Sequence, residues 1–292
     1  MREPKEVLQD KVGGIINLPT LPSIAGRLLR TINSADSSAQ EVAGLICQDP
    51  SLSAKVLRLA NSAFYGMPRT ITSISNAVVI LGLKVINTLV LSLTVFDMFP
   101  ERCGGRLFNR EAFWRHSLGC ALIAKMLARK MQNRVLFDEE VAFCAGLLHD
   151  IGKVVMEQYL HPDFHSALQH AQDTEMPMHE AEFEMLGYMH TDVAEWLTAN
   201  WKLPGEIHHP LYYHHAPHTA PEHTDIVALC HFADILTYEL GLKVDEKYAP
   251  PQLVSGSLDQ LEDAAAAAEA IKADFPSELR KIESFTAAAR QH

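Results

Sequence analysis

Helix-boundary signals recur along this chain, and they constrain its fold more than any other feature. Pro22 precedes a first helical segment, Ser38 precedes AQEVAGLI, and Asp49 and Pro50 end that segment and open the next. Helical periodicity of apolar residues continues in the segments 74–98, 111–131, 139–150, 180–200 and 224–240. Strand-like alternation bounded by hairpin turns is absent from the sequence. We therefore predict an all-α protein.

Two irregular stretches divide the helical segments. The first, PERCGGRLFN, covers residues 100–109, and the second runs from Ala249 to Ser257. They predict a helical N-terminal part over 1–105, a histidine-rich helical part over 106–245 and a C-terminal helical tail over 246–292. The alanine-rich run in the tail is most simply a packed helix.

The segment from Asn76 to Phe99 is long and apolar enough to compare with a membrane span. Lys84, Asn87 and Asp97 interrupt it, and a lysine at the centre of a bilayer costs about 3 kcal/mol. We predict one or two buried helices here and no association with a membrane.

The cysteines and the first residues bear on the cellular compartment. The five cysteines lie far apart without a CxxC pair, which is typical of a reducing cytoplasm. The opening MREPKEVLQD lacks the apolar core and the cleavage site of a signal peptide. We therefore expect a cytoplasmic protein.

The formal net charge of −11 is unevenly distributed. Residues 1–130 hold 16 Lys and Arg against 9 Asp and Glu, and the remainder holds 9 against 27. The basic residues are scattered along residues 1–130. A solvated basic surface that docks on the acidic half of the same chain is therefore as good an interpretation as a surface that binds nucleic acid. The segment ITSISNAVVILGLKVINTLVL weakly resembles a helix-turn-helix motif, but such a pattern more often reflects helices packed in a hydrophobic core. We do not expect nucleic-acid binding.

Three polar residues fall on apolar helix faces. His116 shares a face with Phe113 and Cys120, His190 lies on the apolar face of its segment, and Asp234 lies on the face of Cys230. A lone core histidine is usually structural, but a buried aspartate is costly without a cation. Their coincidence on separate helices favours a shared ligand.

The segment AFCAGLLHDIGK carries the strongest chemical signal. Neighbouring helical side chains diverge by about 100°, so His149 and Asp150 can hold one ion only near a helix end or bend. Gly152 is well placed to loosen the backbone there. Lys153 lies one turn after His149, and a lysine beside a metal is typical of a phosphate-binding group.

A further histidine pair, His214-His215, precedes Pro217. The same region also holds His208, His209, His218 and His223, so a surface histidine cluster would give the same pattern.

Together these motifs resemble the HD superfamily of metal-dependent phosphohydrolases, and most closely its HDOD branch, the HD-related output domain. The motifs are His116 in WRHS, His149, Asp150 and Lys153 in HDIGK, His190 in LGYMHTDVAEWL, His214-His215, and Asp234 in FAD. LPTLPSIAGRLL, ICQDPSLSAKVLRLANSAFYG and ISNAVVILGLKVINTLVLS resemble the extra helices of that branch. The resemblance runs from about Leu18 to about Tyr238 and implies an HD-type helical bundle with an additional N-terminal helical subdomain.

The resemblance implies a role for each motif residue. His116, His149, Asp150 and Asp234 match the ligands of the first metal, and His190, His214 and His215 match those of a second. Asp150 would bridge the two ions, and Lys153 would contact a substrate phosphate, so these two are the candidate catalytic residues. Imidazole and carboxylate ligands without a thiolate suit one or two divalent ions of iron, manganese, nickel or zinc.

Two departures limit the resemblance. The chain reads APHTAPEH after His215, in place of the ERxDGxGYP of HD-GYP phosphodiesterases, which puts cyclic-dinucleotide cleavage in doubt. Ala112 stands where three-metal relatives place a glutamate, so we expect no third metal.

Two functions therefore stay open. The first is a signalling HDOD protein with an intact HD metal site that hydrolyses a phosphoester or nucleotide. The second is a non-catalytic signalling module in which the metal is structural. No receiver or cyclase domain is recognisable in the sequence, which predicts a signalling partner that acts in trans.

Overall fold

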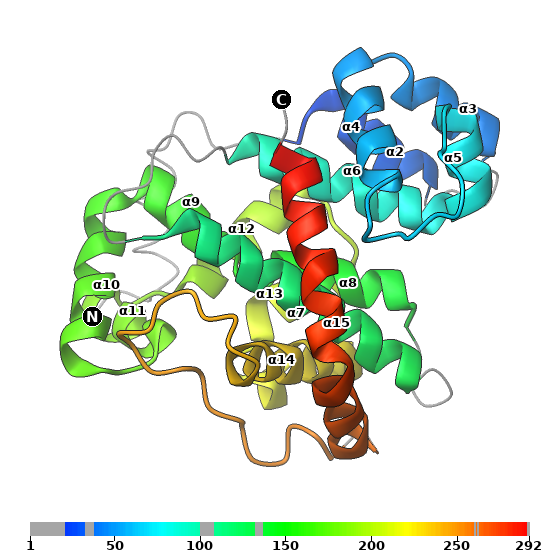
Figure 1. The fold of residues 1–292 in the computed structure, drawn as a ribbon. Helices are drawn as coiled ribbons and strands as arrows, with labels where there is room; N and C mark the ends of the chain where they lie inside the picture. Colours follow the sequence, from blue (N-terminus) through cyan, green and yellow to red (C-terminus); the bar gives the residue numbers. More distant parts are fainter. Residues whose placement is uncertain are drawn as a thin grey trace. The chain divides into compact units, whose positions relative to one another are not determined.

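The computed structural model describes residues 21–32, 38–99, 108–131, 137–259, 261 and 263–290. The predicted boundary at residue 105 and Cys103 lie outside these ranges. Every regular element in the described ranges is helical and none is a strand, which confirms the all-α fold (Figure 1). Contacts between residues divide the chain into two compact units, one formed by 1–19 and 101–273 and the other by 20–100 and 274–292.

The unit formed by 20–100 and 274–292 begins with a series of short capped helices. They are α2 (Ser23–Ile32), α3 (Ala39–Ile46), α4 (Pro50–Ala60), α5 (Ile74–Leu81) and α6 (Leu83–Met98). Ser38 caps α3 by accepting from the backbone N–H of Glu41, and Asp49 caps α4 by accepting from that of Leu52. Pro50 occupies the first position of α4, where its missing N–H costs nothing.

Helices α5 and α6 contain the apolar segment 76–99. No single helix in the described ranges is long and apolar enough to cross a membrane. Together α5 and α6 meet the criteria of length and composition, but the chain bends by 120° between them. Asp97 forms an ion pair with Lys55 of α4 at 2.6 Å, which accounts for a charge within the apolar segment.

The last helix, α15 (Ala264–Arg290), contributes residues to both units. In the unit formed by 20–100 and 274–292, the ring of Phe285 is fully buried against Phe64 and Phe96, with ring centroids 5.0 and 6.3 Å away. The hydroxyl of Ser284 accepts a hydrogen bond from the backbone N–H of Ala63 at 3.0 Å. Ala264, Ala267 and Ala268 of the alanine-rich run are also buried, so this run packs as predicted.

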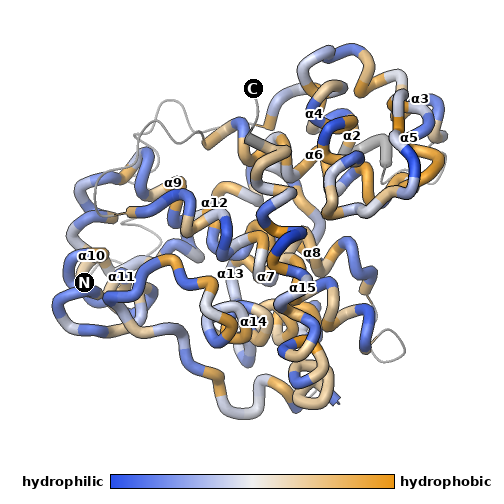
Figure 2. Tube along the Cα trace, viewed as in Figure 1, coloured by the Kyte–Doolittle hydropathy of each residue, from blue (hydrophilic) through white to orange (hydrophobic). Residues whose placement is uncertain are grey.

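The unit formed by 1–19 and 101–273 holds all the predicted site residues. Its helices are α7 (Arg110–Lys130), α8 (Glu139–Leu148), α9 (Ile151–Tyr159), α10 (His161–Thr174), α11 (Met178–Leu186), α12 (His190–Trp201), α13 (Gly205–Tyr213), the 3-10 turn η2 (Pro217–Thr219) and α14 (Thr224–Glu239). Helix α7 packs against α8 and α14, and α12 packs against α9 and α13. Helices α7 and α14 are buried along most of their length and are rich in apolar residues (Figure 2).

Close packing of α7 on α8 depends on a glycine. A Cβ on Gly146 would lie 2.8 Å from the carbonyl oxygen of Cys120 and 2.8 Å from the Cα of Ala121. Only glycine therefore allows the two backbones to approach this closely.

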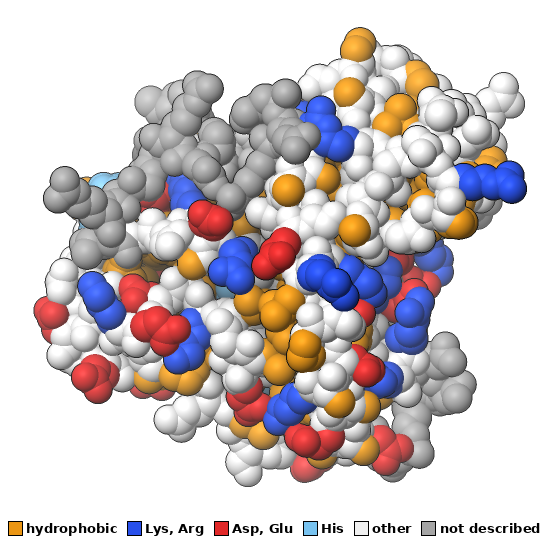
Figure 3. All heavy atoms as spheres, viewed as in Figure 1, with side chains coloured by type: hydrophobic (Ala, Val, Ile, Leu, Met, Phe, Trp, Pro, Cys, Tyr) orange, Lys and Arg blue, Asp and Glu red, His pale blue; other side chains and the backbone are white. Residues whose placement is uncertain are grey.

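Charged side chains of both signs are interspersed over the face drawn in Figure 3. On that face Lys and Arg lie among Asp and Glu, and they do not gather in a basic patch. The expectation that the chain does not bind nucleic acid stays a prediction.

Candidate metal centre

The junction of α8 and α9 places His149 and Asp150 at the centre of the buried site. His149 follows the last residue of α8 and Asp150 precedes the first residue of α9, so the pair lies between two helices, where one ion could use both side chains. Gly152 lies within α9, and a Cβ there would come within 1.9 Å of the carbonyl oxygen of His190. Gly152 therefore allows α9 to approach the start of α12, a different role from the loosening predicted from sequence.

One set of side chains gathers around one end of the Asp150 carboxylate. His116 of α7 and Asp234 of α14 approach each other with 3.0 Å between Nε2 and Oδ1. The Nε2 of His149 lies 3.6 Å from Asp234 Oδ1 and 3.3 Å from Asp150 Oδ2. The Nε2 of His116 lies 3.9 Å from the same Oδ2.

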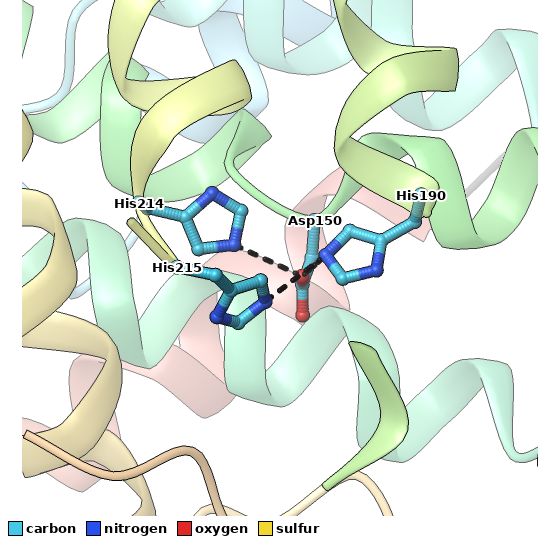
Figure 4. Close-up of side chains that lie close together, drawn as sticks. All are labelled: Asp150, His190, His214 and His215. Atoms are coloured by element: carbon cyan, nitrogen blue, oxygen red, sulfur yellow. Dashed lines mark hydrogen bonds and ion pairs between the residues drawn. The ribbon is translucent and has the colours of Figure 1, made fainter. Parts of the chain in front are cut away.

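A second set surrounds the other oxygen of Asp150 (Figure 4). The Nε2 of His190, at the start of α12, lies 3.0 Å from Asp150 Oδ1, and that of His214, at the end of α13, lies 3.7 Å from it. His215 completes the set, with its Nε2 3.3 Å from the Nε2 of His190. The two oxygens of Asp150 thus face different groups of histidines.

Four of the histidines are oriented by hydrogen bonds from their other ring nitrogen. The acceptors of Nδ1–H are the carbonyl oxygens of Leu242 for His116, Gly146 for His149 and Pro210 for His214, and the carboxylate of Glu182 for His190. The distances are 2.8, 2.8, 3.1 and 2.6 Å in that order. Because these acceptors require a proton on Nδ1, a neutral ring keeps its lone pair on Nε2, which faces Asp150 or Asp234.

Several buried polar atoms that face the centre of the site lack a hydrogen-bond partner among the described residues. The Nε2 atoms of His116, His149 and His214 and the Oδ1 atoms of Asp150 and Asp234 make no hydrogen bond to any described residue. An unsatisfied buried polar atom costs roughly 1–3 kcal/mol. Lone pairs on nitrogen and carboxylate oxygen are what a divalent transition-metal ion accepts. These residues therefore fit a metal ion.

The spacing of the ligand atoms supports more than one ion position. Three groups each bring one ligand atom per residue within 4.8 Å of the others: His116, His149 and Asp150; Asp150, His190, His214 and His215; and His149, His214 and Asp234. Asp150 belongs to the first two groups, as expected of a bridging carboxylate.

The charges of the site suit a cation. Burial would raise the pKa of Asp150, but Lys153 and His149 hold it well below the usual range. Burial would also raise the pKa of Asp234, but the nearby rings of His116 and His149 lower it. Both carboxyl groups are therefore ionised near neutral pH. Burial lowers the pKa of His214 to about 4, so this ring is neutral and free to act as a ligand.

Lys153 lies inside the same cluster. Its Nζ is 2.6 Å from Asp150 Oδ2, and the residue is only 4% exposed. Burial opposes its charge, but the Asp150 carboxylate raises the pKa of the amine above its ordinary value. The structure thus brings together all of the residues predicted for the site.

Comparison with known proteins identifies the family. Residues 18–217 match the HDOD domain, which is more than half of the chain. The chain belongs to the HDOD family. This confirms the family predicted from the motifs.

Two solved structures share the fold of this HDOD protein. An HDOD domain protein of unknown function from Geobacter sulfurreducens is 28% identical, with a TM-score of 0.79 over 98% of this chain and 97% of that one. A candidate phosphohydrolase from Shewanella amazonensis SB2B is 24% identical, with a TM-score of 0.73 over 96% of this chain and 97% of that one.

An uncharacterised protein of Treponema pallidum (strain Nichols) is 26% identical over 243 residues. The match covers 82% of the HDOD protein and 46% of the Treponema protein, so this chain spans less than half the length of that relative.

Two residues of the HDOD protein that contact the candidate ligands were not predicted from the sequence. Glu182 of α11 is fully buried and accepts hydrogen bonds from both Nδ1 and the backbone N–H of His190. It shares the buried face of α11 with Met178 and Ala181, so the face test that singled out His190 would have found it. His179 stacks on His215 with ring centroids 3.9 Å apart, and no local pattern signals this contact.

A strap formed by residues 240–259 covers the site. Its Leu242 carbonyl holds His116, the Asp245 carboxylate accepts from the side chain of Gln172 at 2.6 Å, and the backbone N–H of Val254 donates to Nε2 of His231 at 3.0 Å. Tyr248 is 6% exposed and hydrogen-bonds to Tyr238, and burial together with the nearby Asp150 raises its pKa. The strap therefore packs against the centre, where His215 stays partly exposed.

Proposed function

We propose that this HDOD protein is a signal-transduction module built around a divalent-metal centre. The observation that carries the proposal is the arrangement around Asp150, whose two carboxylate oxygens face two groups of oriented histidines. His116, His149, Asp150 and Asp234 would hold one ion, and Asp150, His190, His214 and His215 would hold a second. Imidazole and carboxylate ligands, with no cysteine in either group, suit iron, manganese, nickel or zinc.

The closed state of the site favours the signalling reading. Lys153 is paired with Asp150, both residues are buried, and Tyr248 of the strap lies near them. A phosphoester would therefore have to compete with Asp150 for the amine of Lys153. In this reading the ions hold six helices together (α7, α8, α9, α12, α13 and α14), and the module works through contacts with a signalling protein in trans.

A metal-dependent phosphohydrolase is the second candidate, and Lys153 is the observation that favours it. An amine buried beside a metal ligand is well placed to bind a phosphoryl oxygen and stabilise the charge that develops on it. A divalent ion at this site would supply Lewis acidity for the hydrolysis of a phosphoester or nucleotide. Asp150 would orient both ion positions, and Glu182 would hold His190 in its ligand tautomer.

Metal analysis of the anaerobically purified chain tests the centre. We expect about one or two equivalents of a divalent transition metal in the native protein. Asp150→Asn should lower this content, whereas Asp173→Asn, an exposed carboxylate on α10, should leave it unchanged. A native protein without metal, or an Asp150→Asn variant with undiminished metal, would refute the proposal.

A phosphodiester assay then separates the two candidates. The native metal form would be incubated with bis(p-nitrophenyl) phosphate and a panel of nucleotides. Turnover that is lost in Lys153→Ala while the metal is retained would establish a hydrolase. The absence of turnover with iron, manganese, nickel and zinc would establish the signalling module.

We also propose that the protein works in the cytoplasm. Cys47, Cys120 and Cys230 are free thiols, and Cys120 and Cys230 are buried. Unpaired thiols suit a reducing compartment.

A further inference from the structure

A second cluster of metal-ligating side chains lies outside the buried centre. It consists of His209 on α13 and of Glu222 and His223, which immediately precede α14. Each offers one ligand atom, and these atoms lie within 4.8 Å of one another. We propose that this cluster is a separate, partly exposed binding site for a divalent transition-metal ion.

The orientation of His209 supports a ligand role. Its Nδ1 lies 3.1 Å from the backbone carbonyl oxygen of Glu222, so Nδ1 carries the proton and Nε2 keeps its lone pair. The same backbone contact orients His149 and His214 at the buried centre. A ligand held through its second nitrogen in this way is the usual arrangement at metal sites.

The spacing of the two rings matches that of the buried centre. The centroids of His209 and His223 are 5.2 Å apart. At the buried centre the corresponding distances are 5.3 Å for His116 and His149, assigned to one ion, and 5.6 Å for His190 and His214, assigned to the other. The outer pair is therefore separated as the rings of a shared ion would be.

The backbone at His223 makes it possible for adjacent residues to serve one ion. His223 has a left-handed conformation, with φ 54° and ψ 35°. In a regular helix the side chains of Glu222 and His223 would diverge by about 100°. A non-glycine residue keeps a left-handed conformation only where its surroundings hold it, and such residues concentrate at binding sites.

Gly205 seats the ring of His223. A Cβ at this position would lie 2.7 Å from Nε2 and 3.1 Å from Cδ2 of His223. Because the obstructed atoms belong to the end of a side chain, Gly205→Ala would move the ring and leave the backbone in place. This substitution therefore probes the proposed site without removing a ligand.

The donor set defines the class of ion and the effect of binding. Two imidazoles and one carboxylate, with water in the remaining positions, suit zinc and the neighbouring transition metals better than calcium or magnesium. An ion held by His209, Glu222 and His223 would tie α13 to the start of α14. The segment between them carries His214 and His215, so the outer ion would fix both ends of the segment that supplies ligands to the buried centre.

Zinc titration of the full chain tests the site. The protein would be purified without chelator, its resident metal quantified, and further Zn²⁺ binding followed by calorimetry. We expect about one additional equivalent of zinc in the native chain, and its loss in His223→Gln and in His209→Gln. His218→Gln, a change to an exposed histidine of η2, should retain it. Gly205→Ala should weaken this binding by roughly 10–100-fold, the range seen when a ligand loses its orientation.

The outcome of the zinc titration does not depend on the metal content of the buried centre. If the native chain binds no additional zinc, or if His209→Gln and His223→Gln bind as much as the native chain, the inference is wrong. Loss of resident metal in Asp150→Asn with the additional zinc unchanged would show that the two sites are distinct. Circular dichroism of each variant establishes that a lost site does not reflect a lost fold.

Discussion

The carboxylate of Glu182 accepts two hydrogen bonds from His190, one from the backbone N–H at 2.8 Å and one from Nδ1 at 2.6 Å. One carboxylate thus fixes both the start of α12 and the tautomer of its first side chain. Because Nδ1 is the donor, Nε2 of His190 is the nitrogen that faces Asp150. Glu182 is therefore a positioning residue for the second group of proposed ligands.

Replacement of Glu182 should weaken metal binding. We expect Glu182→Gln to lower the affinity of the second ion by roughly 10–100-fold, because the amide can present its N–H₂ to His190 and favour the wrong tautomer. Competition with a chromophoric chelator measures this affinity. Glu184→Gln, an exposed change on the same helix, is the matched control. Equal affinities for the two variants would contradict the positioning role.

Gly152→Ala should disrupt the site through the backbone. The new Cβ would lie 1.9 Å from the carbonyl oxygen of His190, so α9 and α12 must separate. We expect a loss of about 1–3 kcal/mol or more in the free energy of unfolding, together with a lower metal content.

The control is Gly44→Ala in α3, where no atom lies within 4 Å of the added Cβ. That change should be neutral or stabilising by about 0.5–1 kcal/mol. Urea denaturation of both variants decides the matter, and equal stabilities would show that α9 and α12 do not require this approach.

Replacing one residue of the buried ion pair between Arg110 and Glu157 should destabilise the protein more than replacing both residues. Arg110 begins α7 and donates to the fully buried carboxylate of Glu157 on α9. Arg110→Met alone should cost about 3–5 kcal/mol, because it leaves a buried charge without a partner.

The double variant Arg110→Met with Glu157→Leu should recover most of that stability, since no charge is left in the interior. Chemical denaturation of the two single variants and the double variant measures the coupling. Additive losses would mean that the two residues do not act as a pair.

Opening the strap should expose the metal centre. Tyr248→Ala removes the largest buried side chain of residues 243–250 and its hydrogen bond to Tyr238. We expect EDTA to remove the resident metal faster, because opening of the strap would no longer limit the rate at which the chelator reaches the metal. Lys247→Ala, an exposed neighbour, should leave the rate unchanged. If both variants lose metal at the native rate, the strap does not limit access.

Most of the site could be predicted from the positions of its residues on helix faces. The period of the helix places His116, His190 and Asp234 on the same faces as apolar residues. Their burial could therefore be predicted, and the structure shows it. The bend at His149 and Asp150 followed from the need of adjacent side chains to reach one ion. Assignment of ligands to two groups depended on the resemblance to the HD superfamily, and their chemical role stays a prediction.

The partners of the histidines could not be predicted from the sequence. Three of the four acceptors are backbone carbonyls, which every residue possesses, so residue type gives no signal for them. Gly146 and Pro210 lie within one turn of their histidines, but Leu242 meets His116 only through the path of the strap. The packing of Tyr248 beside the site has the same origin, because long-range contacts of an irregular segment depend on the whole fold.

The contact between His116 and Leu242 spans 126 positions of the chain. During synthesis, His116 leaves the ribosome long before the carbonyl that fixes its ring, and Asp234 also follows much later. The nascent helices can therefore form locally while the ion pocket is still missing one wall. The proposed ion site would therefore be complete only when the chain has been made beyond Leu242, so the first proposed ligand to be synthesised is among the last to be oriented.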